Sequence, residues 1–246
     1  MRRYTRPVTD VPATSAGVLG LGFMLGLRHA LDVDHLAAVS TLVSARPGVR
    51  SSAAVGALWG LGHTSALLAA ALAVIGLHAA IPPSVGRALE LGVALMLIGL
   101  GVNVLVALGR GSTVHVHRHR HGGHEHAHVH LHSPLPAGGA HHHAVRATPR
   151  PFWVGVVHGL AGSAGLMLAV AATIPTPGLA LAYVAVFGVG SIGGMALMST
   201  LLGVPLALAA ERWARAERWL GGVAAAASIA IGIALAWELG RTALGA

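Results

Sequence analysis

Two histidines, two aspartates and an arginine lie within eight residues of an otherwise apolar stretch, in the segment RHALDVDH (28–35). Charged side chains inside such a stretch cost about 2.5–3.5 kcal/mol each on membrane-insertion scales, so they normally face a partner or an ion. Neutral imidazole suits nickel, cobalt, zinc or copper ions, and an ionised carboxylate offsets the charge of the ion. An Arg28–Asp32 ion pair would explain two of these side chains but not the others. The segment therefore predicts a site for a divalent transition-metal ion.

The geometry of this segment leaves the identity of the carboxylate ligand open. On a straight helix, at about 100° per residue, His29, Asp32 and His35 share one face and Asp34 points elsewhere. Asp32 is then the better ligand. If the helix instead unwinds near Val33, as discontinuous membrane helices do, His29, Asp34 and His35 can meet at one ion. We expect the ligands to come from this segment, with Asp32 or Asp34 as the anionic partner.

Four polar side chains in other apolar stretches are candidates to complete the site. His63 lies among small residues in WGLGHTS. We expect it to be a third histidine ligand, the alternative being a hydrogen-bonded structural histidine. His158 and Ser163 belong to HGLAGSAG, whose glycines equally suit close helix packing, and we expect these two residues to line the facing wall of the site. Asn103 either orients a ligand or bridges two helices.

Twelve of the 17 histidines form a separate polar tract between residues 115 and 143. The tract carries almost no apolar run, and we expect it to be disordered. Histidine-rich tracts bind metal by composition, so we expect this one to buffer the ion, hand it over or sense its level. The alternatives are a linker of biased composition and a pH-responsive tail. The histidines are His115, His117, His119, His121, His124, His126, His128, His130, His132, His141, His142 and His143.

These residues are carried by a chain whose composition is that of an integral membrane protein. Of its 246 residues, 54% are hydrophobic and only 10% are charged, whereas soluble domains carry about a quarter charged residues. The absence of cysteine excludes disulfides, thiolate metal sites and a cysteine nucleophile. A helix needs roughly 20 apolar residues to cross the hydrocarbon core, and six stretches qualify. They are residues 16–43, 52–80, 85–108, 152–174, 179–203 and 219–239, the fifth being ended by Pro205.

The arginines predict how these spans are oriented. Ten arginines fall in segments on one side of the expected membrane and five on the other, and the positive-inside rule makes the richer side cytoplasmic. We therefore expect a multi-pass protein of the bacterial plasma membrane, with its N-terminus outside and the histidine-rich tract inside. The net charge of +8 is spread in small groups between apolar runs, which argues against nucleic acid as a partner.

An internal repeat divides the chain. At an offset near 129 residues, GLRHAL (26–31) matches GVVHGL (155–160), WGLG (59–62) matches FGVG (187–190), and RALELGVAL (87–95) loosely matches RWLGGVAAA (218–226). Chance matches in a glycine-rich chain are the alternative. The repeat predicts an all-α fold of two three-helix units, 1–108 and 152–246, joined by the polar segment 109–151. Three spans in each unit invert the second unit in the membrane, an arrangement typical of transporters.

Three of the segments quoted above resemble the motifs of one known family. RHALDVDH, with His29, four intervening residues, Asp34 and His35, is similar to the signature of the nickel/cobalt transporter superfamily, the NiCoT and NicO-type permeases. LGHTS (61–65) and HGLAGSAG (158–165) resemble its second-helix and later-helix motifs, in the form most similar to the urease-accessory or high-affinity nickel-transport branch. The resemblance extends over residues 17–239. It implies that His29, Asp34, His35 and His63 are metal-selective.

The resemblance implies a permease that carries Ni²⁺ or Co²⁺ by alternating access, without a prosthetic group. Uptake is favoured, but six spans with a histidine-rich central loop also resemble efflux members, so the direction stays open. We expect the ion and the lipid bilayer as partners, and a cytoplasmic metallochaperone as a further candidate. A membrane-bound metal sensor or store, in which the loop is the working part, is the alternative from another class. An intramembrane hydrolase is disfavoured, because Gly162-Ser163-Ala164-Gly165 lacks the Gly-X-Ser-Gly order of a serine nucleophile.

Overall fold

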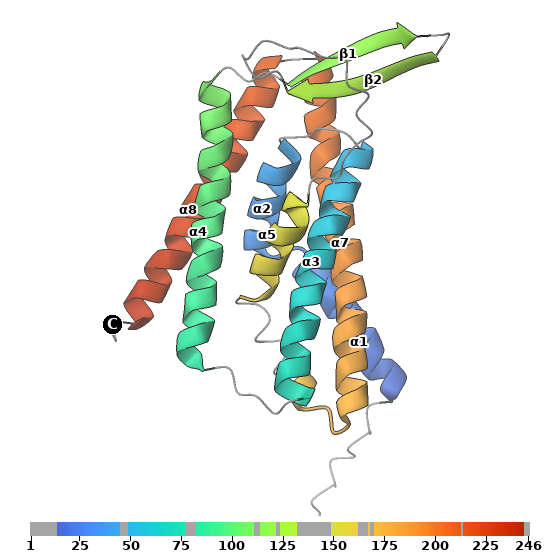
Figure 1. Cartoon of the computed structure of the whole chain (residues 1–246), viewed down its shortest axis with the longest axis vertical. Coiled ribbons are helices and arrows are strands. Elements are labelled where there is room, and N and C mark those ends of the chain that lie inside the picture. Colours follow the sequence, from blue (N-terminus) through green and yellow to red (C-terminus); the bar gives the residue numbers. More distant parts are fainter. Residues whose placement is uncertain are drawn as a thin grey trace, which may run out of the picture.

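The computed structural model describes residues 14–44, 49–76, 82–110, 114–121, 124–131, 149–161, 167, 170–212 and 214–243. Its long helices are α3 (Val49–Ala71), α4 (Pro83–Gly109), α7 (Pro177–Arg212) and α8 (Ala214–Ala243) (Figure 1). Within the described residues, these four are long and apolar enough to cross a membrane. Large apolar side chains such as Leu95, Leu197 and Val223 are exposed on them, as expected of surfaces that face lipid. Length and surface together indicate a multi-pass membrane protein.

The first expected span, 16–43, is broken. It consists of α1 (Ser15–His29) and α2 (Val33–Ser44), which meet at a bend of 56°. Between them, the backbone N–H of Asp32 donates to the carbonyl oxygen of His29 at 3.1 Å, three residues back instead of the four of an α-helix. The helix therefore unwinds directly before α2. Of the two geometries that the sequence leaves open, the discontinuous one is present.

The helix starts follow ordinary capping chemistry. At the start of α1, Oγ1 of Thr14 accepts a hydrogen bond from the backbone N–H of Gly17 at 3.2 Å, which satisfies one of the unpaired donors of the first turn. α4 begins with Pro83. A proline at this position costs no backbone hydrogen bond, because the N–H that it lacks has no partner within the helix.

The fourth expected span, 152–174, differs from the prediction. It begins with α5 (Arg150–Gly159), which is only 10 residues long, and residues 162–166 and 168–169 lie outside the described part of the chain. The described residues contain four candidate spans, or five if the bent α1–α2 pair counts as one, where the sequence predicts six. The end of α5 coincides with the start of GLAGSAG (159–165), in which each glycine disfavours a helix by about 1 kcal/mol relative to alanine.

Pro205 does not end its helix, so that prediction is wrong. α7 continues through this residue to Arg212. A proline inside a helix removes one backbone hydrogen bond, but membrane helices tolerate it because neighbouring groups satisfy the freed carbonyl. α3 also departs from regular geometry, since it continues into a short π-helical turn, η1 (Leu72–Gly76).

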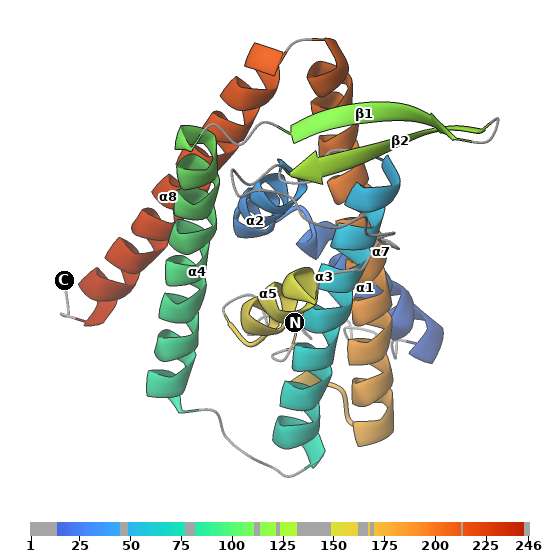
Figure 2. The ribbon, with the colours of Figure 1, turned by 45° about the horizontal axis from the view of Figure 1, so that its top comes forward.

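A β-hairpin forms part of the tract for which the sequence predicts disorder. β1 (Val114–His121) and β2 (His124–Leu131) pair in antiparallel fashion at one end of the helical bundle (Figures 1 and 2). Histidines at every second position match the two-residue period of a strand, so the alternation is a strand pattern as well as a compositional bias. The sequence does not predict these two strands, which add to the helical bundle. The disorder expected of the wider tract stays a prediction. His132 and His141–His143 lie outside the described ones.

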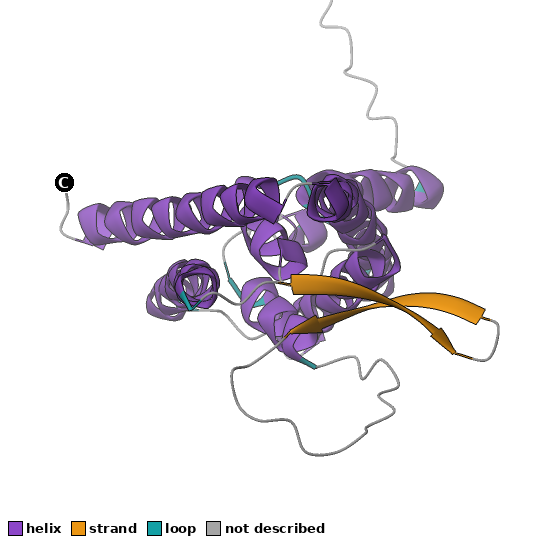
Figure 3. Ribbon diagram, turned by 90° about the horizontal axis from the view of Figure 1, so that it is seen from above, coloured by secondary structure: helices purple, strands orange, loops and turns teal. Residues whose placement is uncertain are grey.

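The helices pack through close approaches at small residues. A Cβ atom at Gly26 of α1 would collide with the carbonyl oxygen of Phe187 on α7, and one at Gly155 of α5 would collide with the carbonyl oxygen of Trp59 on α3. Such approaches are open only to glycine and are common between membrane helices. In Figures 2 and 3, the short helices α2 and α5 lie between the α4–α8 pair and the group formed by α1, α3 and α7. The two broken or short segments are thus enclosed by long helices.

Candidate metal centre

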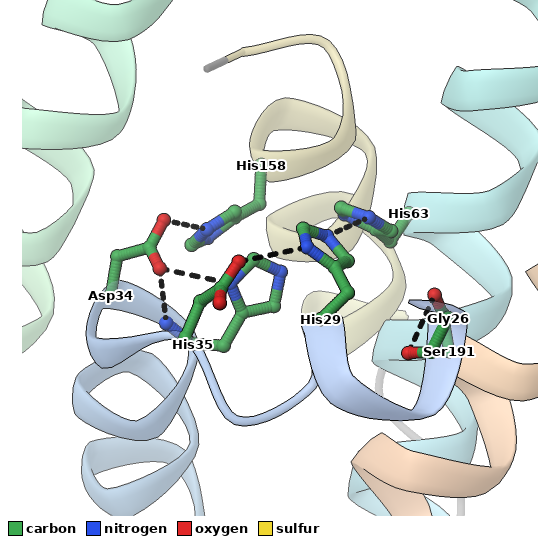
Figure 4. A network of polar contacts seen from close by, with 8 residues as sticks. Gly26, His29, Asp34, His35, His63, His158 and Ser191 are labelled. Carbon is green, nitrogen blue, oxygen red and sulfur yellow. Dashed lines mark hydrogen bonds and ion pairs between the residues drawn. The ribbon is translucent and has the colours of Figure 1, made fainter. Parts of the chain in front are cut away.

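Four buried histidines meet at the break of the first span (Figure 4). His29 is the last residue of α1, His35 lies in the first turn of α2, His63 lies within α3 and His158 lies in the last turn of α5. None is more than 7% exposed. Asp34 joins them from the first turn of α2, with a side chain that is 24% exposed. The change of direction at the break brings His29, Asp34 and His35 together, which a straight helix does not allow.

The Asp34 carboxylate is held between two of the histidines. Its Oδ1 accepts a hydrogen bond from the backbone N–H of His35 at 2.9 Å and lies 3.0 Å from Nδ1 of the same residue, while its Oδ2 lies 2.9 Å from Nε2 of His158. A carboxylate only accepts, so each facing nitrogen of a neutral imidazole carries the proton. The other ring nitrogens, Nε2 of His35 and Nδ1 of His158, are buried and have no hydrogen-bond partner among the described residues. These are lone pairs that a cation could satisfy.

His29 and His63 form the other half of the cluster. Their Nε2 atoms lie 3.0 Å apart, and Nδ1 of His29 lies 2.9 Å from Oδ2 of Asp32. Asp32 sits in the break between the helices, with a side chain that is 45% exposed. A carboxylate that receives one ring N–H fixes the tautomer and the orientation of a histidine, which is a common arrangement around metal-ligating imidazoles. Asp32 thus contacts the cluster from its edge, through His29.

Two sets of three side chains have the spacing of a metal site. The ligand atoms of His29, His35 and His63 lie within 4.8 Å of one another, and so do those of Asp34, His35 and His158. His35 belongs to both sets. Its ring centroid is 4.3 Å from that of His29 and 4.2 Å from that of His158. Imidazole and carboxylate ligands in this number suit Ni²⁺, Co²⁺, Zn²⁺ or Cu²⁺.

The surroundings of the cluster favour a cation. α1 and α5 both end there and α2 begins there. Because each helix C-terminus carries the equivalent of about half a negative charge and each N-terminus about half a positive one, the three helix ends together contribute about half a negative charge. Two buried aromatic rings cover the histidines: the ring centroid of Trp59 lies 5.2 Å from that of His35, and that of Phe187 lies 5.4 Å from that of His29. No chemistry in the sequence points to these two residues. The internal repeat does point to Trp59 and Phe187, because they are the first residues of the matching segments WGLG and FGVG.

The remaining predicted site residues lie elsewhere or outside the described part of the chain. Asn103 is exposed on α4. Ser163 is outside the described residues. The hairpin histidines lie at one end of the bundle, whereas the break between α1 and α2 lies near its middle (Figure 1). The structure therefore brings together the predicted ligands of three separate helical segments, with His158 in direct contact with Asp34.

One sequence match in the hairpin has no catalytic geometry. His-Glu-His-Ala-His (124–128) fits the pattern His-Glu-X-X-His of zinc proteases, which requires a helix so that the two histidines lie one turn apart. Here the segment belongs to β2. Positions four apart on a strand are separated by roughly 13 Å, too far to bind one zinc ion.

Comparison with known proteins agrees with the chemistry of the cluster. A family model described as high-affinity nickel-transport protein (NicO) matches residues 15–242. The urease accessory protein UreH of Bacillus sp. (strain TB-90) is 31% identical over 195 residues, which cover 79% of this chain and 80% of that relative. No solved structure matches. The family match includes every helix from α1 to α8 almost to its end.

Proposed function

This chain belongs to the NicO family of high-affinity nickel-transport proteins, and we propose that it carries Ni²⁺ across the membrane through the cluster at the break of the first span. Members of this family are transporters, not enzymes. One observation carries the proposal: His29, His35 and His63 are buried, with ligand atoms within 4.8 Å of one another. Polar groups buried among membrane helices are costly, and they mark ion pathways.

We assign the three histidines as nitrogen ligands and Asp34 as the anionic ligand. The 56° bend supports Asp34, because the straight helix that would favour Asp32 is absent from this segment. Asp32 then orients His29 through the 2.9 Å contact to Nδ1. Ser163 stays a candidate for the facing wall by its place in the repeat. The exposure of Asn103 on α4 argues against a place beside the ion.

The transport architecture that we propose is a pair of inverted three-helix repeats, six spans in all, with alternating access around the cluster. Residues 1–108 and 152–246 would form the two units. The glycine contacts support this. Gly26 of the first unit approaches Phe187 of the second, and Gly155 of the second unit approaches Trp59 of the first. Gly26 is equivalent to Gly155 in the repeat, and Trp59 to Phe187, so the same contact occurs twice. The α4–α8 contact repeats in the same way, since Gly101 meets the Ala225 carbonyl and Gly232 meets the Ala94 carbonyl.

We propose that the direction is uptake across the plasma membrane of a bacterium, with efflux as the alternative. High affinity, as the family description states, is what the capture of a dilute external ion requires, whereas export deals with an ion in excess. The hairpin would lie on the cytoplasmic side. In support, the end of α4 and the junction of α7 with α8 lie at the hairpin end of the bundle (Figure 1). The sequence has Arg110, Arg212 and Arg218 in or next to these segments, as the positive-inside rule expects of cytoplasmic segments.

Cobalt is the second substrate that the ligand set allows. Imidazole and carboxylate ligands bind Co²⁺ and Ni²⁺ with similar preference, because neither is soft enough to select between them. We propose Ni²⁺ as the main cargo, on the strength of the family description, and no prosthetic group. Competition by a tenfold excess of Co²⁺ in a nickel-flux assay would measure the preference.

We propose that the histidine-rich segment 109–151 buffers the ion on the cytoplasmic side. In the hairpin, histidine is opposite histidine at every second register position: His115 opposite His130, His117 opposite His128, His119 opposite His126, and His121 opposite His124. Residues directly opposite in an antiparallel pair have Cβ atoms about 4.5–5.5 Å apart. The register therefore places eight histidines at directly opposite backbone positions, which supports weak, multiple metal binding and transfer to a metallochaperone.

The proposal is tested by labelled-nickel flux in cells that express the wild-type chain or His29→Ala. Wild-type cells should accumulate Ni²⁺ if the direction is uptake and lose it if the direction is efflux, and the variant should do neither. Ser228→Ala is the matched control, because it removes a buried hydrogen bond to the Leu97 carbonyl at 2.8 Å in the α4–α8 contact and touches no ligand. Equal flux in wild type and His29→Ala would overturn the site, and no nickel movement by wild type would overturn the function.

A further inference from the structure

We infer that the cluster offers the ion two adjacent positions that share His35, and that the ion passes between them by changing partners around this one histidine. The histidine position consists of His29, His35 and His63. The carboxylate position consists of Asp34, His35 and His158. This inference rests on the proposed nickel transport and gives His158 the role of a ligand instead of a wall.

The two positions are different sets of ligands that have only His35 in common. Each set of three lies within 4.8 Å, but no set of four or five does so among the described residues. The ring centroids of His63 and His158 are 6.1 Å apart, and each of these residues belongs to a different set. A single ion bound by all five side chains would require the helices α3 and α5 to close further, where Gly155 and Trp59 already prevent a closer approach.

His35 is placed to serve both positions, but not at once. Its ring lies between Asp34 and His29 (Figure 4). Nδ1 lies 3.0 Å from Oδ1 of Asp34, and Nε2 is buried without a hydrogen-bond partner among the described residues. A neutral imidazole has one unprotonated nitrogen, so His35 can bind an ion in only one of the positions at a time. The cluster therefore holds one ion per chain. This ion moves between the two positions, and the two positions are not occupied by two ions at the same time.

The two positions differ in access and in charge. The three ligands of the histidine position are all buried. The carboxylate position reaches the accessible surface through Asp34, whose side chain is 24% exposed. Transport requires binding that is strong enough to take the ion from water and weak enough to release it. The carboxylate position is accessible and charged, whereas the histidine position is enclosed and made of neutral ligands. The pair therefore offers the ion one stronger and one weaker place to bind, and His35 is the ligand through which it moves between them.

The experiment measures binding and movement separately, with Ni²⁺ alone as the probe. The purified full chain, and the same chain without residues 112–146, are tested by equilibrium dialysis against labelled Ni²⁺, so that ions bound by the histidine-rich segment are counted separately from those bound by the cluster. The full chain is also tested by flux into lipid vesicles. His29→Gln leaves the carboxylate position complete, and His158→Gln leaves the histidine position complete. Each should keep saturable binding of one ion in the cluster, with a Kd within about 100-fold of wild type, while flux falls at least about tenfold. His35→Gln damages both positions and should lose the ion bound by the cluster.

A second readout shows which position the ion occupies. Infrared difference spectra on addition of Ni²⁺ should contain a shifted carboxylate band in His29→Gln, where the ion is confined beside Asp34. The same band should be absent in His158→Gln, where the ion is confined to the three histidines. This distinction does not depend on the amount of flux, and a general loss of structure would not produce it.

Several results would overturn the two-position arrangement. These are wild-type flux in His158→Gln, loss of cluster binding in His158→Gln as complete as in His35→Gln, or two ions bound by the cluster of the wild-type chain. Ser228→Ala, monodisperse and active, controls for folding, and His158→Asp tests rescue, since it restores a ligand and should recover part of the flux. Failure of the proposed function is a different result, namely wild-type vesicles that take up no more Ni²⁺ than protein-free vesicles.

Discussion

The packing of α5 against α3 gives a prediction whose size can be worked out from the structure. A Cβ atom at Gly155 would lie 2.9 Å from both the carbonyl carbon of Trp59 and the backbone nitrogen of His63 and would collide with the Trp59 oxygen, whereas ordinary contacts begin at 3.4 Å. These neighbours are backbone atoms, so the helices must separate by at least about 0.5 Å to admit Gly155→Ala, at a cost of about 1–3 kcal/mol.

This separation moves His158 on α5 and His63 on α3 apart, so His35 on α2, which belongs to both sets of three, can no longer lie within ligand distance of each. Metal sites tolerate errors of about 0.2 Å in ligand distance, and a displacement of about 1 Å in a reacting group costs about 100-fold in rate. We therefore expect Gly155→Ala to lower nickel flux by about tenfold or more and to lower the Tm of the purified protein.

The control for this variant is Gly99→Ala. Gly99 lies within α4, and a Cβ atom there would meet no atom within 4 Å. Alanine in a helix interior is favoured over glycine by about 0.5–1 kcal/mol, so this variant should keep wild-type flux and the same or a slightly higher Tm. Both properties are read from vesicle flux of labelled Ni²⁺ and thermal unfolding in detergent. Wild-type flux and Tm in Gly155→Ala would refute the packing argument.

Three other predictions concern the carboxylates and the loop. Asp34→Asn should reduce nickel flux by about 100-fold, since it removes the anionic ligand. Asp32→Asn should reduce the flux by only about tenfold, since Asp32 acts through the orientation of His29. The reverse order in the same flux assay would identify Asp32 as the ligand. Deletion of residues 112–146 should leave flux at saturating Ni²⁺ within about twofold of wild type while reducing the number of ions bound per chain in dialysis, and loss of flux would favour the sensor or storage alternative. The extra ions bound by the full chain should be lost when the pH is lowered from 7.5 to 5.5, because imidazole, with an ordinary pKa of about 6.5, must be unprotonated to bind metal; extra ions still bound at pH 5.5 would contradict histidine ligation in the loop.

The sequence identifies the ligand types but cannot choose the geometry of the first span. His29 and Asp32 are three residues apart, so they lie on one face of a straight helix, and they also stay in contact across the break at 2.9 Å. The choice depends on a tertiary contact, since Asp34 is held by His158 from a helix far along the chain. Local spacing contains no information on that partner. The repeat alignment contains some, because it places His158 at the position of His29.

The elements that the sequence misjudges have identifiable physical causes. The hairpin has a local signal, since Gly122-Gly123 between two alternating runs is typical of a two-residue hairpin connection, but the polar composition of the tract argues for disorder. A proline such as Pro205 ends a helix in a soluble protein more reliably than in a membrane bundle, where neighbouring groups satisfy the freed carbonyl. The short α5 reflects glycines whose low helix propensity outweighs their apolar character. Hydropathy locates the long helices well because length and composition alone decide them.

The most direct test of nickel transport through the cluster is flux in a purified system. Wild-type protein and His35→Gln are reconstituted in lipid vesicles, and entry of labelled Ni²⁺ is followed against protein-free vesicles. Wild type should show saturable flux, and His35→Gln, which lacks the ligand common to both sets of three, should fall to the rate of protein-free vesicles. Wild-type flux equal to that of protein-free vesicles, or equal flux in wild type and His35→Gln, would contradict the account.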